Sequence, residues 1–181
     1  MKKLSQSSGL GFTLIELLVS VSVFIIIVTI AVGGFVGALR TQRQVAALIS
    51  ANNNVSLAIE QMAREIRTGR NFCDPECPSR GAGFSELKFY NARGEFITYR
   101  KSPGGGATIE KDDGSGFKPI TGQNALVWTL DFFLSGQDID DDWPTRVTIA
   151  VSVSAKEHGV KEGAIRLQTT VSSRQEDEIT P

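Results

Sequence analysis

The stretch GLGFTLIELLVS, residues 9–20, opens the most apolar part of the chain and carries a single carboxylate, Glu16. From residue 17 to residue 39 no side chain is charged. An α-helix rises about 1.5 Å per residue and the hydrocarbon layer of a bilayer is about 30 Å thick, so this run is long enough to cross a membrane. Val and Ile are frequent in it, but we expect a helix, because a lone strand in lipid would leave its backbone groups unpaired.

The composition of the whole chain bounds the other possibilities. Its 181 residues have room for one ordinary domain with an appendage. Lys and Arg number 19 and Asp and Glu number 20, which gives a formal net charge of −1. Proteins that hold nucleic acid through its phosphates carry an excess of basic residues, so the sequence gives no direct sign of nucleic-acid binding.

The polar segment before Phe12 does not read as an ordinary signal peptide. A secretory signal has a small-residue cleavage site after its apolar core, and no such site follows residue 39. We therefore expect the apolar segment to be retained. Lys2 and Lys3 precede it and Arg40 and Arg43 follow it, so charge alone does not fix its orientation in a membrane.

Glu16 has two interpretations from the residues alone. A carboxylate inside or at the edge of a bilayer is costly unless it has a partner or a function. Glu16 can simply lie in the headgroup layer, or it can serve an interaction that forms later.

The string GFTLIELLVS, with its short basic leader and the uncharged helix after it, resembles the N-terminus of type IV prepilins and type II secretion pseudopilins. The resemblance implies that a membrane-embedded prepilin peptidase cuts after Gly11 and methylates the new N-terminus, Phe12. It also implies that Glu16 guides assembly by pairing with the amine of Phe12 in a neighbouring subunit. Such a pair fixes register more than it adds affinity.

The resemblance also implies partners and a location. The partners would be the prepilin peptidase, other pilin or pseudopilin subunits, an inner-membrane assembly platform, and membrane lipid before assembly. The chain would be a single-pass protein of the inner (cytoplasmic) membrane, with its head outside the cytoplasm, and then part of a pilus or pseudopilus. RVTIAVSV and LQTTVSSR resemble the last strands of minor pilins and pseudopilins of the J or W type, which favours a minor subunit. The alternative is a membrane-anchored extracytoplasmic binding module or enzyme that forms no filament.

Beyond residue 39 the pattern becomes amphipathic. No proline interrupts residues 12–68, and Gly69 suits the end of a helix, so we expect one continuous helix. Gly33 and Gly34 are its weak point, and either local melting in a filament or close helix packing would explain them. Apolar residues at steps of three and four predict that its second half covers a sheet: Val45, Leu48, Ile49, Val55, Ile59, Met62, Ala63 and Ile66.

After Gly69 the period becomes alternating, which predicts strands, and NARG, residues 91–94, is the predicted turn between SELKFY and EFITYRK. In residues 125–134 one face would hold Leu126, Trp128, Leu130, Phe132 and Leu134, and in residues 146–153 one face would hold Val147, Ile149, Val151 and Val153. The predicted fold class is α+β: a long N-terminal helix, transmembrane in its first half and amphipathic in its second, packed on an antiparallel β-sheet head, as in pilins. The predicted segments are a leader (1–11), a transmembrane and assembly helix (12–39), its amphipathic continuation (40–69), a β-rich head (70–174) and a polar tail (175–181).

Two clusters have chemical potential. Cys73 and Cys77 would form a disulfide if the head lies outside the cytoplasm. The alternative is a metal site, but two thiols supply only half of the four ligands that a structural zinc needs. Asp138, Asp140 and Asp142 in GQDIDDDWP could hold calcium, but their spacing does not match an EF-hand and a solvated turn is the simpler interpretation.

Nothing in the sequence resembles a catalytic set. His158 is the only histidine and lies in a predicted turn, so no Ser/His/Asp or Cys/His arrangement can be built without it. We therefore expect no enzymatic activity and no cofactor. Trp128 is expected in the core, and Trp143, next to the acidic segment, is the tryptophan expected to be exposed.

Overall fold

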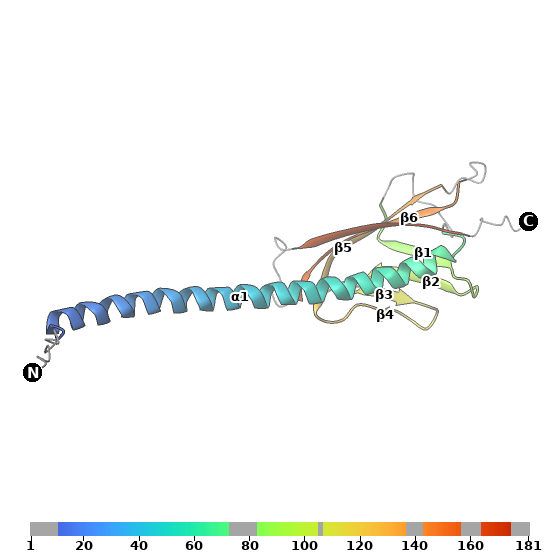
Figure 1. Ribbon diagram of the computed structural model, residues 1–181. Helices are drawn as coiled ribbons and strands as arrows, with labels where there is room; N and C mark the ends of the chain where they lie inside the picture. The colour runs from blue at the N-terminus through green and yellow to red at the C-terminus, as the bar shows by residue number, and fades with distance from the viewer. Residues whose placement is uncertain (1–10, 73–82, 105–106, 137–142, 157–163, 175–181) are drawn as a thin grey trace, which may run out of the picture. The chain divides into compact units, whose positions relative to one another are not determined.

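The computed structural model describes residues 11–72, 83–104, 107–136, 143–156 and 164–174 (Figure 1). The chain divides into two compact units, Met1–Arg43 and Gln44–Pro181, and we call the second the head. In chain order the elements are α1 (Leu14–Arg67), β1 (Glu86–Tyr90), β2 (Phe96–Lys101), β3 (Ile109–Asp112), β4 (Lys118–Pro119), β5 (Ala125–Ser135), β6 (Arg146–Ala155) and β7 (Ile165–Ser172).

The single long helix predicted from the sequence is present as α1. It runs through Gly33 and Gly34 without a break. At its other end, a side chain at Gly69 would place its Cβ 2.6 Å from Cδ2 of Phe89. The left-handed residue after the helix is Asn71, with φ of 55°, so Gly69 is needed for close packing against Phe89 rather than for its backbone angle.

The buried face of α1 starts later than the sequence pattern predicted. Val45 and Ile49 are 48% and 55% exposed, which contradicts their place on the packed face. The step from Ile49 to Val55 is six residues, which is about one and two-thirds turns. Val45 and Ile49 therefore lie on a different side of the helix from Val55. Within α1 the buried residues follow steps of four and three: Ala51, Val55, Ala58, Met62 and Ile66.

The head contains two antiparallel sheets where we expected one. A four-stranded sheet has the order β1-β2-β3-β4, and a three-stranded sheet has the order β5-β6-β7. The short β4 was not predicted, because two residues, one of them a proline, show no alternation. The β1–β2 connection is the turn expected at residues 91–94: Asn91 Oδ1 accepts hydrogen bonds from the backbone N–H groups of Arg93 and Glu95, at 2.9 and 3.0 Å.

The segment that leads from one sheet to the other is tied to α1 by amide side chains. Asn54 Nδ2 donates to Asn124 Oδ1 at 2.6 Å, and Asn54 Oδ1 accepts from the backbone N–H of Gly122 at 3.0 Å. Asn124 Nδ2 in turn donates to Ser50 Oγ at 2.8 Å. Asn54 thus pairs the backbone N–H of Gly122 where the chain passes from one sheet to the other.

A β-bulge in β5 corrects the predicted face of that strand. Val127 pairs with Val153 and Thr129 with Ser152, so Trp128 is an extra residue and the alternation shifts there. The buried residues of β5 are Ala125, Val127, Leu130, Phe132 and Leu134. Leu126 and Trp128 are half-buried on the other face. In β6 the predicted inward face is confirmed, and all four of its residues are buried: Val147, Ile149, Val151 and Val153.

The core of the head joins α1 to both sheets in one apolar cluster. Near the end of α1 it is aromatic: Phe89 stacks between Phe72 and Tyr99, with ring centroids 5.3 and 6.1 Å away. The predicted α+β class, a long helix packed on antiparallel strands, is therefore confirmed, with two sheets in place of one.

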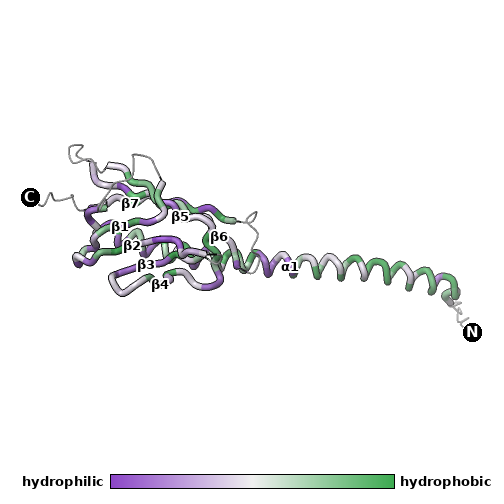
Figure 2. Tube along the Cα trace, turned by 180° about the vertical axis from the view of Figure 1, so that it is seen from behind, coloured by the Kyte–Doolittle hydropathy of each residue, from purple (hydrophilic) through white to green (hydrophobic). Residues whose placement is uncertain are grey.

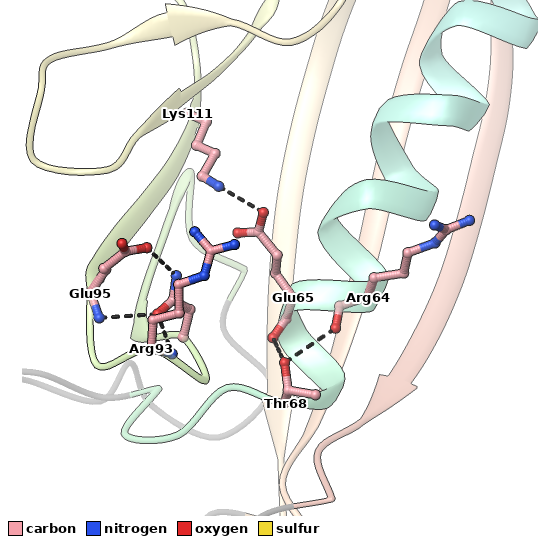
Figure 3. Close-up of polar contacts among 7 residues, drawn as sticks. Arg64, Glu65, Thr68, Arg93, Glu95 and Lys111 are labelled. Atoms are coloured by element: carbon pink, nitrogen blue, oxygen red, sulfur yellow. Dashed lines mark hydrogen bonds and ion pairs between the residues drawn. The ribbon is translucent and has the colours of Figure 1, made fainter.

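One ion pair fixes the last turns of α1 to the four-stranded sheet. Lys111 Nζ lies 2.6 Å from Glu65 Oε1, and Figure 3 shows the two side chains pointing toward each other from β3 and α1. Both side chains are less than a quarter exposed, at 18% and 24%. Burial, together with the Glu65 carboxylate beside it, raises the pKa of Tyr99 above its ordinary value. The Tyr99 ring lies 5.9 Å from the same lysine nitrogen.

Candidate assembly site at the start of α1

Glu16 is bound to its own helix through a reciprocal cap. The backbone N–H and the hydroxyl of Thr13 both donate to Glu16 Oε2, each at 3.1 Å, and the backbone N–H of Glu16 donates to Thr13 Oγ1 at 3.3 Å. This is a capping box, in which the residue before the helix and the third helical residue satisfy each other's backbone donors. Sequence reasoning missed Thr13, although the Thr-x-x-Glu spacing is its signal.

The cap uses one oxygen of the carboxylate. Within the described residues, Glu16 Oε1 has no hydrogen-bond partner. A carboxylate in the first turn is also favoured by the positive end of the helix dipole. The start of α1 therefore presents a negatively charged oxygen that can accept a donor from a second molecule while the cap stays intact.

Gly11 and Phe12 lie just outside the helix and are exposed. Phe12 is 86% exposed. A Cβ built on Gly11 would meet no atom within 4 Å. The described part of the chain therefore places no steric demand for glycine at position 11.

The first half of α1 exposes apolar side chains on every side, and the tube in Figure 2 is mostly green over this stretch, the colour of hydrophobic residues. By length and composition α1 can cross a membrane, which is consistent with a membrane anchor or a signal sequence. The large exposed apolar residues here are Leu14, Ile15, Leu17, Leu18, Val19, Val21, Val23, Phe24, Ile25, Ile26, Ile27, Val28, Ile30, Val32, Phe35, Val36 and Leu39.

The hydroxyl side chains of this stretch are satisfied within the helix. Ser20, Ser22, Thr29 and Thr41 each donate to the carbonyl oxygen four residues earlier, at 2.7, 2.8, 2.8 and 3.2 Å. Such bonds remove the need for water at these groups. The surface can therefore meet lipid or another helix without leaving a hydroxyl unpaired.

Three glycines give the same stretch a place for close approach. Gly33, Gly34 and Gly37 are helical and exposed, and a Cβ at any of them would meet no atom within 4 Å. Small residues on an apolar helix allow a second backbone to come near. This surface suits the interpretation that Gly33 and Gly34 allow close packing of helices.

Of the other residues singled out in the sequence, the structure describes the two tryptophans. Cys73, Cys77, Asp138, Asp140, Asp142 and His158 lie outside the described residues. Trp143 is 63% exposed, as expected, and the guanidinium of Arg146 lies 5.1 Å from its ring centroid. Among the residues that the structure describes, no group of three or more His, Cys, Asp and Glu side chains is arranged to hold a metal ion.

In comparisons with protein-family models, with curated proteins and with solved structures, nothing significantly matches this chain. Its architecture is nevertheless pilin-like: a long N-terminal apolar helix whose second half packs on antiparallel sheets.

Proposed function

We propose that this chain is a structural subunit, in the manner of a minor pilin or pseudopilin, of a type IV pilus or type II secretion-like filament. It is inserted in the inner membrane through α1, cleaved after Gly11 by a prepilin peptidase and methylated at Phe12. It then packs helix to helix with other subunits, without enzymatic activity. The observation that carries the proposal is the joint presence of the Gly11–Phe12–Glu16 motif and the pilin-like architecture.

The exposed surface of residues 14–39 supports a helical partner. Apolar side chains cover this stretch on all sides, so water is an unfavourable neighbour for it. Before assembly, lipid would cover it, and in a filament the same stretch of other subunits would do so. The glycines and the internally bonded hydroxyls suit both environments.

The geometry at Glu16 supports a defined role for the carboxylate in that packing. Oε2 is used by the cap of its own helix, and Oε1 is available to the amine of Phe12 in a neighbouring subunit. The pair does not require the cap to open. An amine freed by cleavage would thus meet a carboxylate that is already held in place, which fixes the register of one helix against the next.

The deciding experiment is mass spectrometry of the protein isolated from its own host. We expect a mature chain that begins with methylated Phe12. A chain that keeps residues 1–11 would refute the processing step and would favour a membrane-anchored binding module or enzyme. Immunoblots of sheared surface filaments then test assembly, since an anchored module would remain in the membrane fraction.

A further inference from the structure

The head has a groove of about 390 Å³ where β1, β2 and β5 meet. Its size falls within the range of small-ligand sites. Its lining includes charged residues of both signs, residues with hydroxyl side chains and one tryptophan. The lining residues that matter for its chemistry are Glu86, Arg100, Lys101, Trp128, Thr129 and Asp131.

The bulge in β5 builds one wall of this groove. Trp128, the extra residue of the bulge, and Thr129 both line the groove. The indole is held in place, since its Nε1 donates to Ser154 Oγ at 2.9 Å. Bulges are frequent beside binding sites, where they re-aim a side chain.

Several polar groups in the groove have bonding capacity left over. Lys101 Nζ donates to the carbonyl oxygen of Trp128 at 3.0 Å, and an ammonium has three N–H donors. Within the described part of the chain, the Asp131 carboxylate has neither an ion pair nor a hydrogen bond. The Thr129 side chain is exposed and can both donate and accept.

We propose that this groove binds a neutral saccharide, with sugar hydroxyls accepting from Lys101 and donating to Asp131, and with a C–H face of the ring against the indole of Trp128. Sugar hydroxyls both donate and accept, so they suit a site that offers a cation, a carboxylate and a hydroxyl side by side. The lining holds two acidic residues, Glu86 and Asp131, and two basic ones, Arg100 and Lys101, so it has no excess of either sign, which speaks against a strongly charged ligand.

An extended peptide fits the groove less well than a saccharide. A strand added to the edge of β5 would need the carbonyl of Trp128, which Lys101 already occupies. The same edge is closed on both sides, because Phe84 and Phe132 exchange backbone hydrogen bonds and Val127 donates to the carbonyl of Ala107. The free length of the edge is too short for a ladder.

The test uses the full-length protein in phospholipid nanodiscs, which avoids detergents with sugar headgroups. The chain has two tryptophans, so Trp143→Phe leaves Trp128 as the only indole. Maltose, cellobiose and N,N′-diacetylchitobiose are titrated against this variant. We expect a saturable change in fluorescence with at least one of them, and saturation-transfer NMR gives a readout that needs no change in emission.

Matched variants locate the binding. Asp131→Ala should weaken it about tenfold, because a hydrogen bond to a charged group is lost. Asp113→Asn, on the β3–β4 connection outside the groove, should leave it unchanged. Circular dichroism confirms that each variant is folded.

Two results would overturn the proposal. One is the absence of a saturable response to all three sugars by both readouts, and the other is equal binding by Asp131→Ala. A response to an acetylated tetra-alanine amide in place of the sugars would show a peptide site instead. None of these outcomes depends on cleavage after Gly11, so the filament proposal is tested separately.

Discussion

Two stretches of the same helix, residues 14–39 and residues 51–66, differ in what surrounds them. The first is the more apolar, yet its large side chains are exposed. The second is amphipathic and has five buried residues that face the sheets of the head. Apolar content therefore does not mark the core of this protein. The described chain leaves the apolar surface of the first stretch uncovered, and under the proposed function lipid or other subunits would cover it, whereas the second stretch is covered by the chain itself.

The polar groups of the two stretches differ in the same way. In the first, hydroxyl groups bond to the backbone of the helix, as Ser20 does to the carbonyl of Glu16. In the second, side chains bond to residues beyond the helix, as Asn54 does to Asn124 and Glu65 to Lys111. Substitutions in the first stretch should therefore affect processing and assembly, and those in the second should affect the stability of the head.

The largest expected effect is the loss of processing in Gly11→Leu. A Cβ at this position meets no described atom of its own chain within 4 Å, so the variant should insert in the membrane and keep its leader. Mass spectrometry of the membrane fraction measures this, and Gly9→Leu is the matched control that should still be cleaved. Normal mature protein from Gly11→Leu would contradict the assignment.

The next effect separates the charge of Glu16 from its cap. Glu16→Gln retains an acceptor for the capping box but removes the charge, so we expect about a tenfold drop in filament incorporation with normal membrane insertion. Thr13→Val removes the capping hydroxyl and keeps the charge, so it should assemble far better than Glu16→Gln. Quantitative blots of sheared filaments against membranes measure both. Equal incorporation of Glu16→Gln and the unmodified chain would remove the proposed role.

In the packed stretch, Met62→Ala should lower the free energy of unfolding of the head by about 2–5 kcal/mol, because it leaves a cavity in the core. Leu57→Ala, on the exposed side of the same helix and 68% exposed, should change it by about 0.5 kcal/mol or less. Denaturant unfolding of the full chain, followed by near-ultraviolet circular dichroism, compares the two. Equal losses would mean that the head does not use this face of α1.

A smaller effect is expected for the ion pair at the end of α1. Lys111→Met leaves the half-buried Glu65 carboxylate without its partner and should lower the free energy of unfolding by about 1–3 kcal/mol. Arg64→Met breaks the exposed pair with Glu60 one turn away and should have little effect, because solvent screens that pair. The same unfolding measurement tests both variants.

The smallest effect concerns Asp113 in the β3–β4 connection. Hydrogen bonds from Ser115 hold the pKa of Asp113 below its ordinary value. A carboxylate whose pKa is lowered in the folded state contributes stability above its unfolded pKa, and this is lost as the pH falls through the folded value. Ser115→Ala should raise the pKa of Asp113 toward the ordinary value. A carboxyl NMR titration measures the shift, and an unchanged pKa would show that other contacts hold it.

The sequence allowed the local elements to be predicted because their signals are local. The helix was expected over residues 12–68 and is found at Leu14–Arg67, since the absence of proline and the change of period bound it. The hairpin at Asn91 and the inward face of β6 follow from turn chemistry and alternation. These features depend on residues a few positions apart.

The errors came from contacts between distant residues. One extra residue in β5 displaced Trp128 from the core, and its place is set by the register with β6, not by the alternation of β5 alone. The Glu65–Lys111 pair joins side chains with no local pattern to connect them. The separation into two sheets likewise depends on the segment at Gly122 and Asn124, whose role appears only once α1 lies beside it. At the candidate site, the Thr13 cap was readable from local spacing and was missed.

The bulge at Trp128 also affects which deletions the gene for this protein can accept. Val127 already stands opposite Val153 and Thr129 opposite Ser152, so deleting the single codon for Trp128 would restore a regular ladder and leave every inward side chain of β5 in place. Descendants could thus discard the indole, and with it a wall of the groove, in one in-frame step that spares the interior. Retention of that codon across descendants would point to selection for something other than folding.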